Sequence, residues 1–363
     1  MSCVAFFVTP HGFGHASRAC AVIQELRRIA PSITPLILTT VPKKFFENSL
    51  EDGFFYYPVE TDVGFAQLSA LEIDMEKTVA DLKRFYKSYH ERAKDVKDLL
   101  KRNDTRLVVC DISPFGIQIA SELNLRSVLI ENFTWDWMYG FYEQRFPELV
   151  PISRHIKEVN QTSSYRVRTI PYCGQAPYDL LVPPISRGIR NSRDKVREKL
   201  AIKPNEKMVL VSMGGVFEEL RFINARFLEG LKHHSVKIVC TTEDRGFKRS
   251  DNLIFFPKLS DFYHPDLLNA SDGVIGKLGY STLAEVAHTG VPSAFVVRKD
   301  HPETDYLRSF LHTLGNGLEV TLMEFRGKGM LEKVEKLLEL ERTEARWANG
   351  ASECANLIVH LLN

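Results

Sequence analysis

The sequence predicts an α/β protein of two domains, each a doubly wound parallel sheet covered by helices. Short runs rich in β-branched and aromatic residues alternate with helical patterns along the whole chain, which is typical of parallel α/β sheets. The length of 363 residues is enough for two domains of ordinary size. A Pro/Gly/Arg-rich segment, "PPISRGIR" at 183–190, interrupts the alternation near mid-chain and is typical of a linker.

The first half contains segments of both kinds. A short apolar run indicates a buried strand, and apolar residues at helical spacing indicate an amphipathic helix. The expected strands are 3–8, 34–39, 107–110 and 127–130, and the expected helices are 16–29, 73–101 and 114–123.

The second half repeats the strand pattern. Ser192 is expected to cap a short helix that runs to Leu200, ahead of the first strand of a new sheet. The expected strands are 208–212, 236–240, 253–256, 273–275 and 293–297.

The predicted domains are 1–180 and 181–345, followed by a C-terminal helix, 346–363, that returns to the first domain. A helical pattern over 344–362 is long enough for that return. Two such domains leave a cleft at the carboxyl ends of both sheets, where open α/β sheets bind ligands.

The composition excludes several classes of protein. Lys+Arg 47 against Asp+Glu 46 gives a net charge of +1, so there is no global basic field for nucleic acid. The six cysteines are scattered without a CxxC pair, which argues against a zinc ribbon or disulfide framework and suits a reducing compartment. No apolar run approaches the roughly 20 residues of a membrane span, and the N-terminus lacks a basic signal-peptide region. We expect a cytoplasmic protein.

The stretch "HGFGHAS", residues 11–17, follows a strand and opens a helix. Gly12 and Gly14 allow a tight turn near a ligand. A dinucleotide fingerprint is excluded because Ser17 takes the place of its third glycine, and no GxxxxGK[ST] P-loop occurs in the chain. His11 and His15 lack further ligands at metal-site spacing, so no metal is expected. A neutral histidine here is suited to deprotonating a hydroxyl, and the alternative is a helix-start histidine bonded to backbone.

The segment 272–297 reads as strand, glycine turn, helix, glycine stop and strand. Tyr280 or Ser281 is the expected helix start, and Gly290 is its expected end. The N–H groups of Ser281 and Thr282, with the helix dipole, are suited to a diphosphate. Glu285, one turn further along, is placed to accept hydrogen bonds from a ribose diol, unless it is simply a solvated helix residue.

This segment resembles the donor site of GT-B nucleotide-sugar glycosyltransferases, especially the bacterial muramoyl-pentapeptide N-acetylglucosaminyltransferases. The resemblance implies a GT-B fold, with Gly279, Ser281 and Thr282 at the diphosphate and Glu285 at the ribose. "VSMGG", 211–215, resembles the glycine loop that approaches the phosphates, and "HPETDY", 301–306, lies where that family faces the donor sugar. The remaining residues assigned to the donor side are Gly214, Gly215, Phe256, Lys277, Glu303 and Asp305.

The first half resembles the N-terminal, glycosyltransferase-like domain of plant L-arabinokinases and its free-standing microbial relatives. "HGFGHASR" and "VVCDISPFGIQIASELNLRSVLIENFTWDW" carry this likeness, and the absence of a glycine/serine-rich ATP loop gives no support to kinase activity. In related plant glycosyltransferases an aspartate orients the N-terminal histidine base, a role that the resemblance gives to Asp111; the alternative is a helix cap ahead of Pro114. The residues assigned to the acceptor side are His11, Gly12, Gly14, Asn132 and Trp135.

The predicted function is inverting transfer of a sugar from a nucleotide-diphosphate sugar to an acceptor hydroxyl, with His15 as general base. By resemblance the donor is a UDP-sugar, no metal or other cofactor is obligatory, and the acceptor is unknown. "FFYYP", 54–58, with Lys43 and Lys44 nearby, is suited to contact a membrane surface or a partner, and a peripheral membrane contact is expected if the acceptor is a lipid; the alternative is an ordinary strand. The alternatives are a nucleotide-sugar epimerase of the same fold and a non-catalytic nucleotide-sugar-binding protein.

Overall fold

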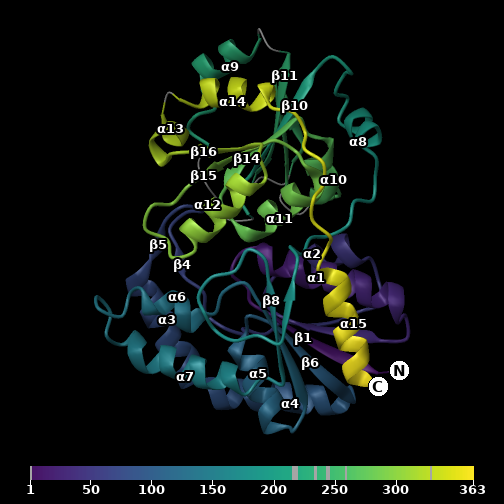
Figure 1. Cartoon of the computed structure of the whole chain (residues 1–363), viewed down its shortest axis with the longest axis vertical. Coiled ribbons are helices and arrows are strands. Elements are labelled where there is room, and N and C mark those ends of the chain that lie inside the picture. The colour runs from purple at the N-terminus through teal and green to yellow at the C-terminus, as the bar shows by residue number, and fades with distance from the viewer. Residues whose placement is uncertain (1, 215–219, 233–234, 243–245, 258–259, 328) are drawn as a thin grey trace. The chain divides into compact units, whose positions relative to one another are not determined.

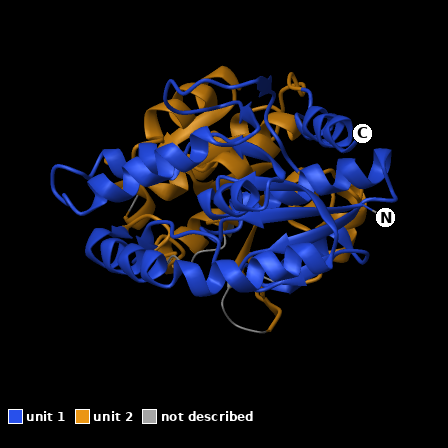
Figure 2. Cartoon of the chain, turned by 90° about the horizontal axis from the view of Figure 1, so that it is seen from below, with its two compact units in different colours: residues 1–68, 73–186, 348–363 blue, residues 69–72, 187–347 orange. Residues whose placement is uncertain are grey.

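The computed structural model describes the whole chain except residues 1, 215–219, 233–234, 243–245, 258–259 and 328. The chain divides into two compact units, coloured separately in Figure 2. Unit 1 comprises 1–68, 73–186 and 348–363, and unit 2 comprises 69–72 and 187–347.

Unit 1 is built on a seven-stranded sheet whose neighbouring strands are all parallel. Every residue of the strand Cys3–Val8 is buried, as expected where helices cover both faces of a parallel sheet. In sheet order the strands are β3 (Phe55–Tyr57), β2 (Thr34–Leu38), β1 (Cys3–Val8), β6 (Thr105–Asp111), β7 (Arg126–Glu131), β8 (Tyr165–Thr169) and β9 (Leu180–Val182). The "FFYYP" segment therefore contributes the edge strand β3.

Helices of unit 1 pack in two groups, visible in Figure 1: α1 with α2 and α15, and α5 with α4 and α7. The chain moves in opposite directions across the sheet from β1 to β2 and from β6 to β7, so right-handed crossovers place α1 and α5 on opposite faces. The helices are α1 (Gly14–Ile29), α2 (Lys43–Leu50), α3 (Met75–Lys87), α4 (Tyr89–Arg102), α5 (Pro114–Glu122), α6 (Trp135–Gly140), α7 (Leu149–Gln161) and α15 (Ala351–Leu362). A short antiparallel pair, β4 (Ala66–Gln67) and β5 (Ile73–Asp74), completes the unit.

The single helix expected over 73–101 is wrong, because the chain breaks at Ser88 into α3 and α4. The Ser88 hydroxyl bonds back to the carbonyl oxygens of Arg84 and Phe85, and the Arg92 guanidinium bonds to the Phe85 carbonyl and the Ser88 hydroxyl. These bonds satisfy carbonyl groups that the helix end leaves open, so side chains replace the helical ladder at this point.

Unit 2 contains a second seven-stranded sheet, parallel except for the edge strand β12. In sheet order its strands are β12 (Lys248–Arg249), β13 (Leu253–Pro257), β11 (Val236–Thr242), β10 (Lys207–Ser212), β14 (Gly273–Lys277), β15 (Ser293–Val296) and β16 (Gly317–Val320). Its helices are α8 (Arg193–Lys199), α9 (Ala225–Lys232), α10 (His264–Ala270), α11 (Tyr280–Thr289), α12 (Thr304–Thr313), α13 (Leu322–Arg326) and α14 (Met330–Glu339).

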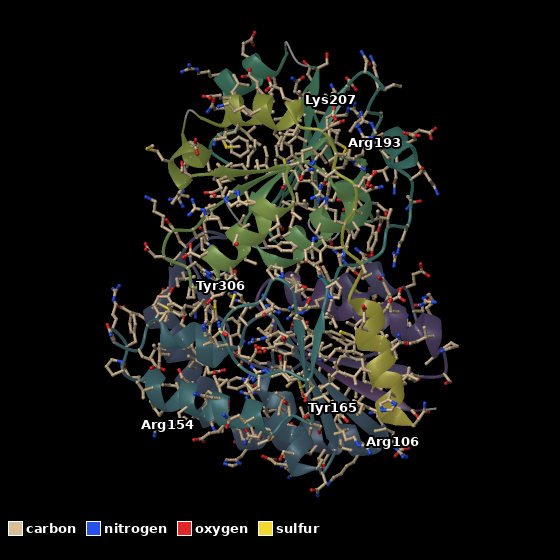
Figure 3. The ribbon with its side chains drawn as sticks, viewed as in Figure 1. Arg106, Arg154, Tyr165, Arg193, Lys207 and Tyr306 are labelled. Carbon is tan, nitrogen blue, oxygen red and sulfur yellow. The ribbon has the colours of Figure 1, made fainter. Side chains whose placement is uncertain are left out.

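Asp272 fixes the short helix α8 to the sheet of unit 2. Its carboxylate receives ion pairs from Arg193 at 2.7 Å, Arg197 at 3.1 Å and Lys207 at 3.7 Å; Arg193 and Lys207 are labelled in Figure 3. The Ser192 side chain accepts a hydrogen bond from the Lys195 N–H, which confirms the predicted N-cap.

The boundaries of the units differ from the predicted domains. Ser186 ends the second segment of unit 1, and its backbone N–H and carbonyl are both bonded to the Asn349 side chain of the tail. Ala70 and Leu71 lie in the core of unit 2, although they come from the first half of the chain. The tail helix begins only at Ala351.

Each sheet has one point where the strand order reverses. The order β3-β2-β1-β6-β7 reverses between β1 and β6, and the order β13-β11-β10-β14-β15 reverses between β10 and β14. In open α/β sheets, ligands bind outside the carboxyl ends of the strands at such a switch point. The two switch points are therefore where a site is expected in each unit.

Candidate active site

The loop after β1 brings two histidines to the switch point of unit 1. Gly12 has a φ of +73°, a conformation that favours glycine, and α1 begins at Gly14. His15 therefore lies in the first turn of α1, where it is 8% exposed.

His15 Nδ1 lies 2.7 Å from Oδ1 of Asp111, the last residue of β6. The register explains the meeting, because Val8, at the end of β1, is paired with Asp111. The alternative of Asp111 as a helix cap is wrong: Ser113 is the N-cap of α5, and Asp111 is directed to α1.

Arg18 is a member of this cluster that the sequence reasoning missed. Its guanidinium is 1% exposed and bonds to both oxygens of Asp111, Nε to Oδ2 at 2.7 Å and Nη2 to Oδ1 at 2.6 Å. Its Nη1 donates to Oδ1 of Asn132 at 2.6 Å. The Nδ2 amide of Asn132 is buried with no hydrogen-bond partner among the described residues. The available sequence signal was the spacing of His15 and Arg18 in "HASR", because residues three apart lie on one helix face.

These contacts define the protonation of the pair. Burial by itself raises the pKa of the Asp111 carboxyl, but the charge of Arg18 and the hydrogen bond from His15 outweigh it and lower the pKa. An ionised carboxylate only accepts hydrogen bonds, so His15 carries its proton on Nδ1 and donates it to Asp111. Nε2 is then the basic nitrogen of the neutral ring.

Asp62 is a second residue that the sequence did not reveal. It accepts hydrogen bonds from the Thr9 hydroxyl at 2.5 Å and the Trp135 indole N–H at 3.3 Å. Burial is the main reason that its pKa rises to about 8. The preceding residue, Thr61, bonds to the Val8 carbonyl at 2.9 Å, which fixes this segment beneath the switch point.

Trp135 and His11 pack together. The Trp135 ring is 1% exposed, with its centroid 5.3 Å from that of His11, and it stacks on Tyr139 at 5.6 Å. His11 is half-buried, and its imidazole occupies the space that a side chain on Gly64 would fill. Trp135 therefore supports the His11 ring as part of the core.

The donor-side residues gather at the switch point of unit 2. Gly214, two residues after the end of β10, has a φ of +72°, and a Cβ on it would lie 3.2 Å from Cε of Lys277. Gly276 is paired with Ser212, and a Cβ on it would lie 2.3 Å from the Ser212 carbonyl oxygen. Gly215 lies outside the described residues.

Helix α11 begins beside this loop. Gly279 is its N-cap and has no side chain to cap the first turn, which contains the N–H groups of Ser281 and Thr282. Gly290 ends the helix with a φ of +65°, which confirms the predicted stop.

Of the four other residues predicted for the donor side, three are buried and one is exposed. Glu285 is 3% exposed and bonded to Arg187 and His264, so it is not a solvated helix residue. Phe256 is buried against Phe262. Glu303 is buried and paired with Arg298 at 3.2 Å, whereas Asp305 is exposed in the first turn of α12.

Among the described residues, no group of three or more His, Cys, Asp or Glu side chains is arranged to hold a metal ion. In the same part of the chain, no helix has the length and apolar composition needed to cross a membrane.

Comparison with solved structures identifies the fold. The calicheamicin glycosyltransferase CalG4 has a TM-score of 0.66 at 14% identity, over 99% of this chain and 98% of that one. The glycosyltransferase VinC in complex with dTDP has a TM-score of 0.64 at 14% identity, over 99% of both chains. The chain has the GT-B fold. Arabidopsis thaliana UGT89C1, complexed with quercetin, has a TM-score of 0.63 at 11% identity, over 99% of both chains.

The curated proteins with similar sequences are matched over only part of their own length. No family model matches the chain. It is 26% identical to the L-arabinokinase of Arabidopsis thaliana over 362 residues, which are 98% of this chain and 34% of that protein. It is 27% identical over 184 residues to an uncharacterised glycosyltransferase of Methanopyrus kandleri, covering 47% of this chain and 50% of that protein. The chain thus spans between a third and a half of the curated relatives that it matches.

Proposed function

We propose that this chain is an inverting glycosyltransferase that moves a sugar from a nucleotide-diphosphate sugar to an acceptor hydroxyl. Unit 1 binds the acceptor and provides the base, and unit 2 binds the donor. The GT-B fold and the switch-point position of both residue clusters support this division.

His15 acts as the general base. Nδ1 is held by Asp111, so Nε2 takes the proton of the acceptor hydroxyl while the acceptor oxygen attacks the anomeric carbon and the bond to the diphosphate breaks. Asp111 stabilises the imidazolium that forms, as the aspartate does in hydrolase triads. His11, Gly12 and Gly14 line the acceptor side, and the buried Nδ2 of Asn132 is a hydrogen-bond donor for an acceptor oxygen.

The donor lies at the switch point of unit 2. Gly214 and Gly279 allow the diphosphate to approach the backbone, Lys277 supplies a positive charge, and Ser281 and Thr282 supply N–H groups at the start of α11. These groups stabilise the leaving diphosphate without an obligatory metal. Gly215 and Phe256 are assigned to the same side, with Glu303 and Asp305 toward the donor sugar and Glu285 toward the ribose.

The donor is a UDP-sugar by the muramoyl-transferase-like signature of 272–297. Because the VinC structure is a complex with dTDP, a dTDP-sugar is the first alternative donor to test beside a UDP-sugar. A peripheral membrane contact follows only if the acceptor proves to be a lipid. The likeness to L-arabinokinase extends over this chain, and we assign it to the sugar-transfer fold, not to kinase activity.

The observation that carries the proposal is the His15–Asp111 pair at the switch point of a GT-B fold. The chain should be titrated with UDP-glucose, UDP-N-acetylglucosamine and dTDP-glucose while thermal unfolding is followed. Ligand at 100 times its Kd should stabilise the folded state by about 2.7 kcal/mol.

The nucleotide sugar that binds should then be incubated with a pool of hydroxyl acceptors. Release of nucleoside diphosphate together with a glycoside of inverted anomeric configuration is the expected result. Absence of binding by every nucleotide sugar contradicts the proposal. Interconversion of donor sugars without acceptor would instead identify an epimerase, and binding without any turnover would identify a binding protein.

A further inference from the structure

Four side chains of unit 2 form a continuous hydrogen-bonded chain. Arg187 Nη2 lies 3.1 Å from Oε1 of Glu285, and Oε2 of Glu285 lies 2.8 Å from Nδ1 of His264. His264 Nε2 lies 2.8 Å from the Ser212 hydroxyl. The four residues come from the linker, α11, the start of α10 and the end of β10.

Glu285 is the charged centre of this chain. Burial by itself raises the pKa of its carboxyl, but the neighbouring His264 and Arg187 outweigh burial and lower the pKa. The ionised carboxylate accepts from both neighbours, so His264 keeps its proton on Nδ1. The state of Nε2 is therefore what can change.

Protonation of Nε2 reverses the bond to Ser212. When Nε2 is bare, the Ser212 hydroxyl donates to it; when Nε2 carries a proton, the imidazolium donates to the Ser212 oxygen. The hydroxyl hydrogen of Ser212 is then released for another acceptor. One proton on His264 thus adds a positive charge and makes Ser212 a donor toward a third partner.

The chain ends at the switch point described above. Ser212 is the last residue of β10, two residues before Gly214, and it is paired with Gly276, which precedes Lys277. Among the members of the chain, His264 has the most exposed side chain, at 28%, against 5% for Arg187 and 3% for Glu285. An anion that reaches this loop therefore meets His264 and Ser212, while Glu285 lies behind them.

The order serine, histidine, carboxylate also occurs in hydrolytic triads. Ser212, however, lies within the ladder of β10 and is only 8% exposed, and Glu285 is shared with Arg187. These features suit a serine that relays a hydrogen bond and not one that attacks a carbonyl carbon.

We infer that His264 is a further donor-binding residue, positioned by Glu285, and that binding of the nucleotide-sugar diphosphate takes up a proton on its imidazole. This inference rests on the proposed function of unit 2 as the donor site. The diphosphate favours the imidazolium by charge and accepts the hydrogen that Ser212 releases. Glu285 then acts on the diphosphate through His264.

The other charged groups around α10 have partners of their own. On α10 itself, Asp266 accepts from the backbone N–H groups of Arg190 and Asn191 and from the Asn191 side chain.

Helix α8 packs against α10 and contributes three cations. Its Arg193 and Arg197 bind the Ala270 carbonyl and Asp272 at the far end of α10. Its Lys199 lies over the Phe262 ring. On α11, His288 lies in the last turn, away from the start of the helix. Glu285 is thus the acidic side chain bonded directly to His264.

Calorimetry of the full chain with UDP-glucose tests the inference, because the phosphodiester groups of this probe do not titrate near neutral pH. Binding enthalpies should be measured at one pH near 7 in buffers of different ionisation enthalpy, which gives the number of protons taken up. We expect uptake of a measurable fraction of one proton by the wild type, and a Kd that rises with pH by up to tenfold per unit.

His264→Gln should abolish the uptake and flatten the pH dependence of Kd. His312→Gln is the matched control, because His312 also lies 2.8 Å from a glutamate, Glu319, on another face of unit 2, and it should leave the uptake unchanged. Ser212→Ala retains the imidazole and should reduce UDP-glucose affinity most at low pH, which provides a second reading if His264→Gln does not fold.

The outcomes separate the two proposals. Tight binding of UDP-glucose without proton uptake, or uptake that persists in His264→Gln, overturns the role of His264 and leaves the donor site intact. Failure of the wild type to bind UDP-glucose and dTDP-glucose contradicts the donor site and removes this inference with it.

Discussion

Arg18 binds Asp111 through two hydrogen bonds, Nε to Oδ2 at 2.7 Å and Nη2 to Oδ1 at 2.6 Å, on the same carboxylate that holds His15. The arginine is nearly inaccessible to solvent, so its charge depends on Asp111 for compensation. Asp111 is thus shared between a fixed cation and a titratable ring. The arrangement is a buried ion pair of Arg18 and Asp111 that also holds the neutral His15 ring, and removal of one member should destabilise the others.

Arg18→Met should therefore destabilise unit 1 strongly, because it leaves Asp111 buried without its main counter-charge. A loss of about 3–5 kcal/mol in the free energy of unfolding is expected from urea denaturation. Arg28→Met, on the same helix and paired with Glu25 at the surface, is the matched control and should cost less than about 1 kcal/mol. Equal losses in the two variants would show that Arg18 does not carry this charge balance.

Asp62 should make stability depend on pH. Burial raises the pKa of its carboxyl from 3.8 to about 8, although hydrogen bonds from Thr9 and Trp135 oppose the rise. Because the folded pKa lies above the unfolded value, the folded state holds a proton that the unfolded state releases between those two pKa values. This contribution to stability is complete below pH 4 and is lost as pH rises to about 8.

Asp62→Asn removes that contribution while keeping the shape of the side chain. The free energy of unfolding of both proteins should be measured by urea denaturation from pH 4 to 8. The value for the variant should increase relative to that of the wild type as pH rises. The relative gain is at most about 1.4 kcal/mol per pH unit. Parallel curves for the two proteins would mean that Asp62 is already ionised in the folded state.

Gly279→Ala should separate donor binding from folding. A Cβ at this position would have Lys277 atoms no nearer than 3.9 Å, and the backbone φ of −149° suits any residue. The fold should therefore tolerate the change, whereas a diphosphate held against the backbone should not. A loss of at least tenfold in UDP-glucose affinity with an unchanged melting temperature is expected.

Gly188→Ala is the control for that experiment, since a Cβ there meets nothing within 4 Å in the linker. It should change neither affinity nor melting temperature. Wild-type affinity in Gly279→Ala would move the diphosphate away from the start of α11.

Local patterns predicted much of the fold. The buried strand 3–8 and the helix stop at Gly290 follow from apolar runs and glycine chemistry, which act over a few residues. The break at Ser88 was missed because side-chain bonds to backbone compete with a helical pattern that continues across them. The placement of 69–72 in unit 2 was not predictable, since it depends on contacts with a core formed more than a hundred residues later.

The candidate site was predictable only where residues follow strands or open helices. His15 and the start of α11 occupy such positions. No local sequence pattern marks Arg18 or Asp62, because their hydrogen-bond partners lie 93 and 53 residues away in sequence. Glu285 was recognised by its place on the helix, but periodicity carries no information on Arg187, 98 residues earlier, which binds it.

The central claim is that His15 and Asp111 form one catalytic unit. His15→Ala should lower turnover of the nucleotide sugar by about 10²–10⁴, the usual contribution of a general base. Asp111→Asn keeps the shape but loses the charge that orients the imidazole, so it should also lower turnover. Donor affinity should be nearly unchanged in His15→Ala, which serves as the control for folding of unit 2.

The most direct measurement is therefore the double-mutant cycle on kcat for His15→Ala and Asp111→Asn. If the two residues act together, the double variant should lose much less than the product of the two single losses, because the second change removes a partner that no longer functions. Near-normal turnover in His15→Ala, or single losses that multiply fully in the double variant, would contradict the account.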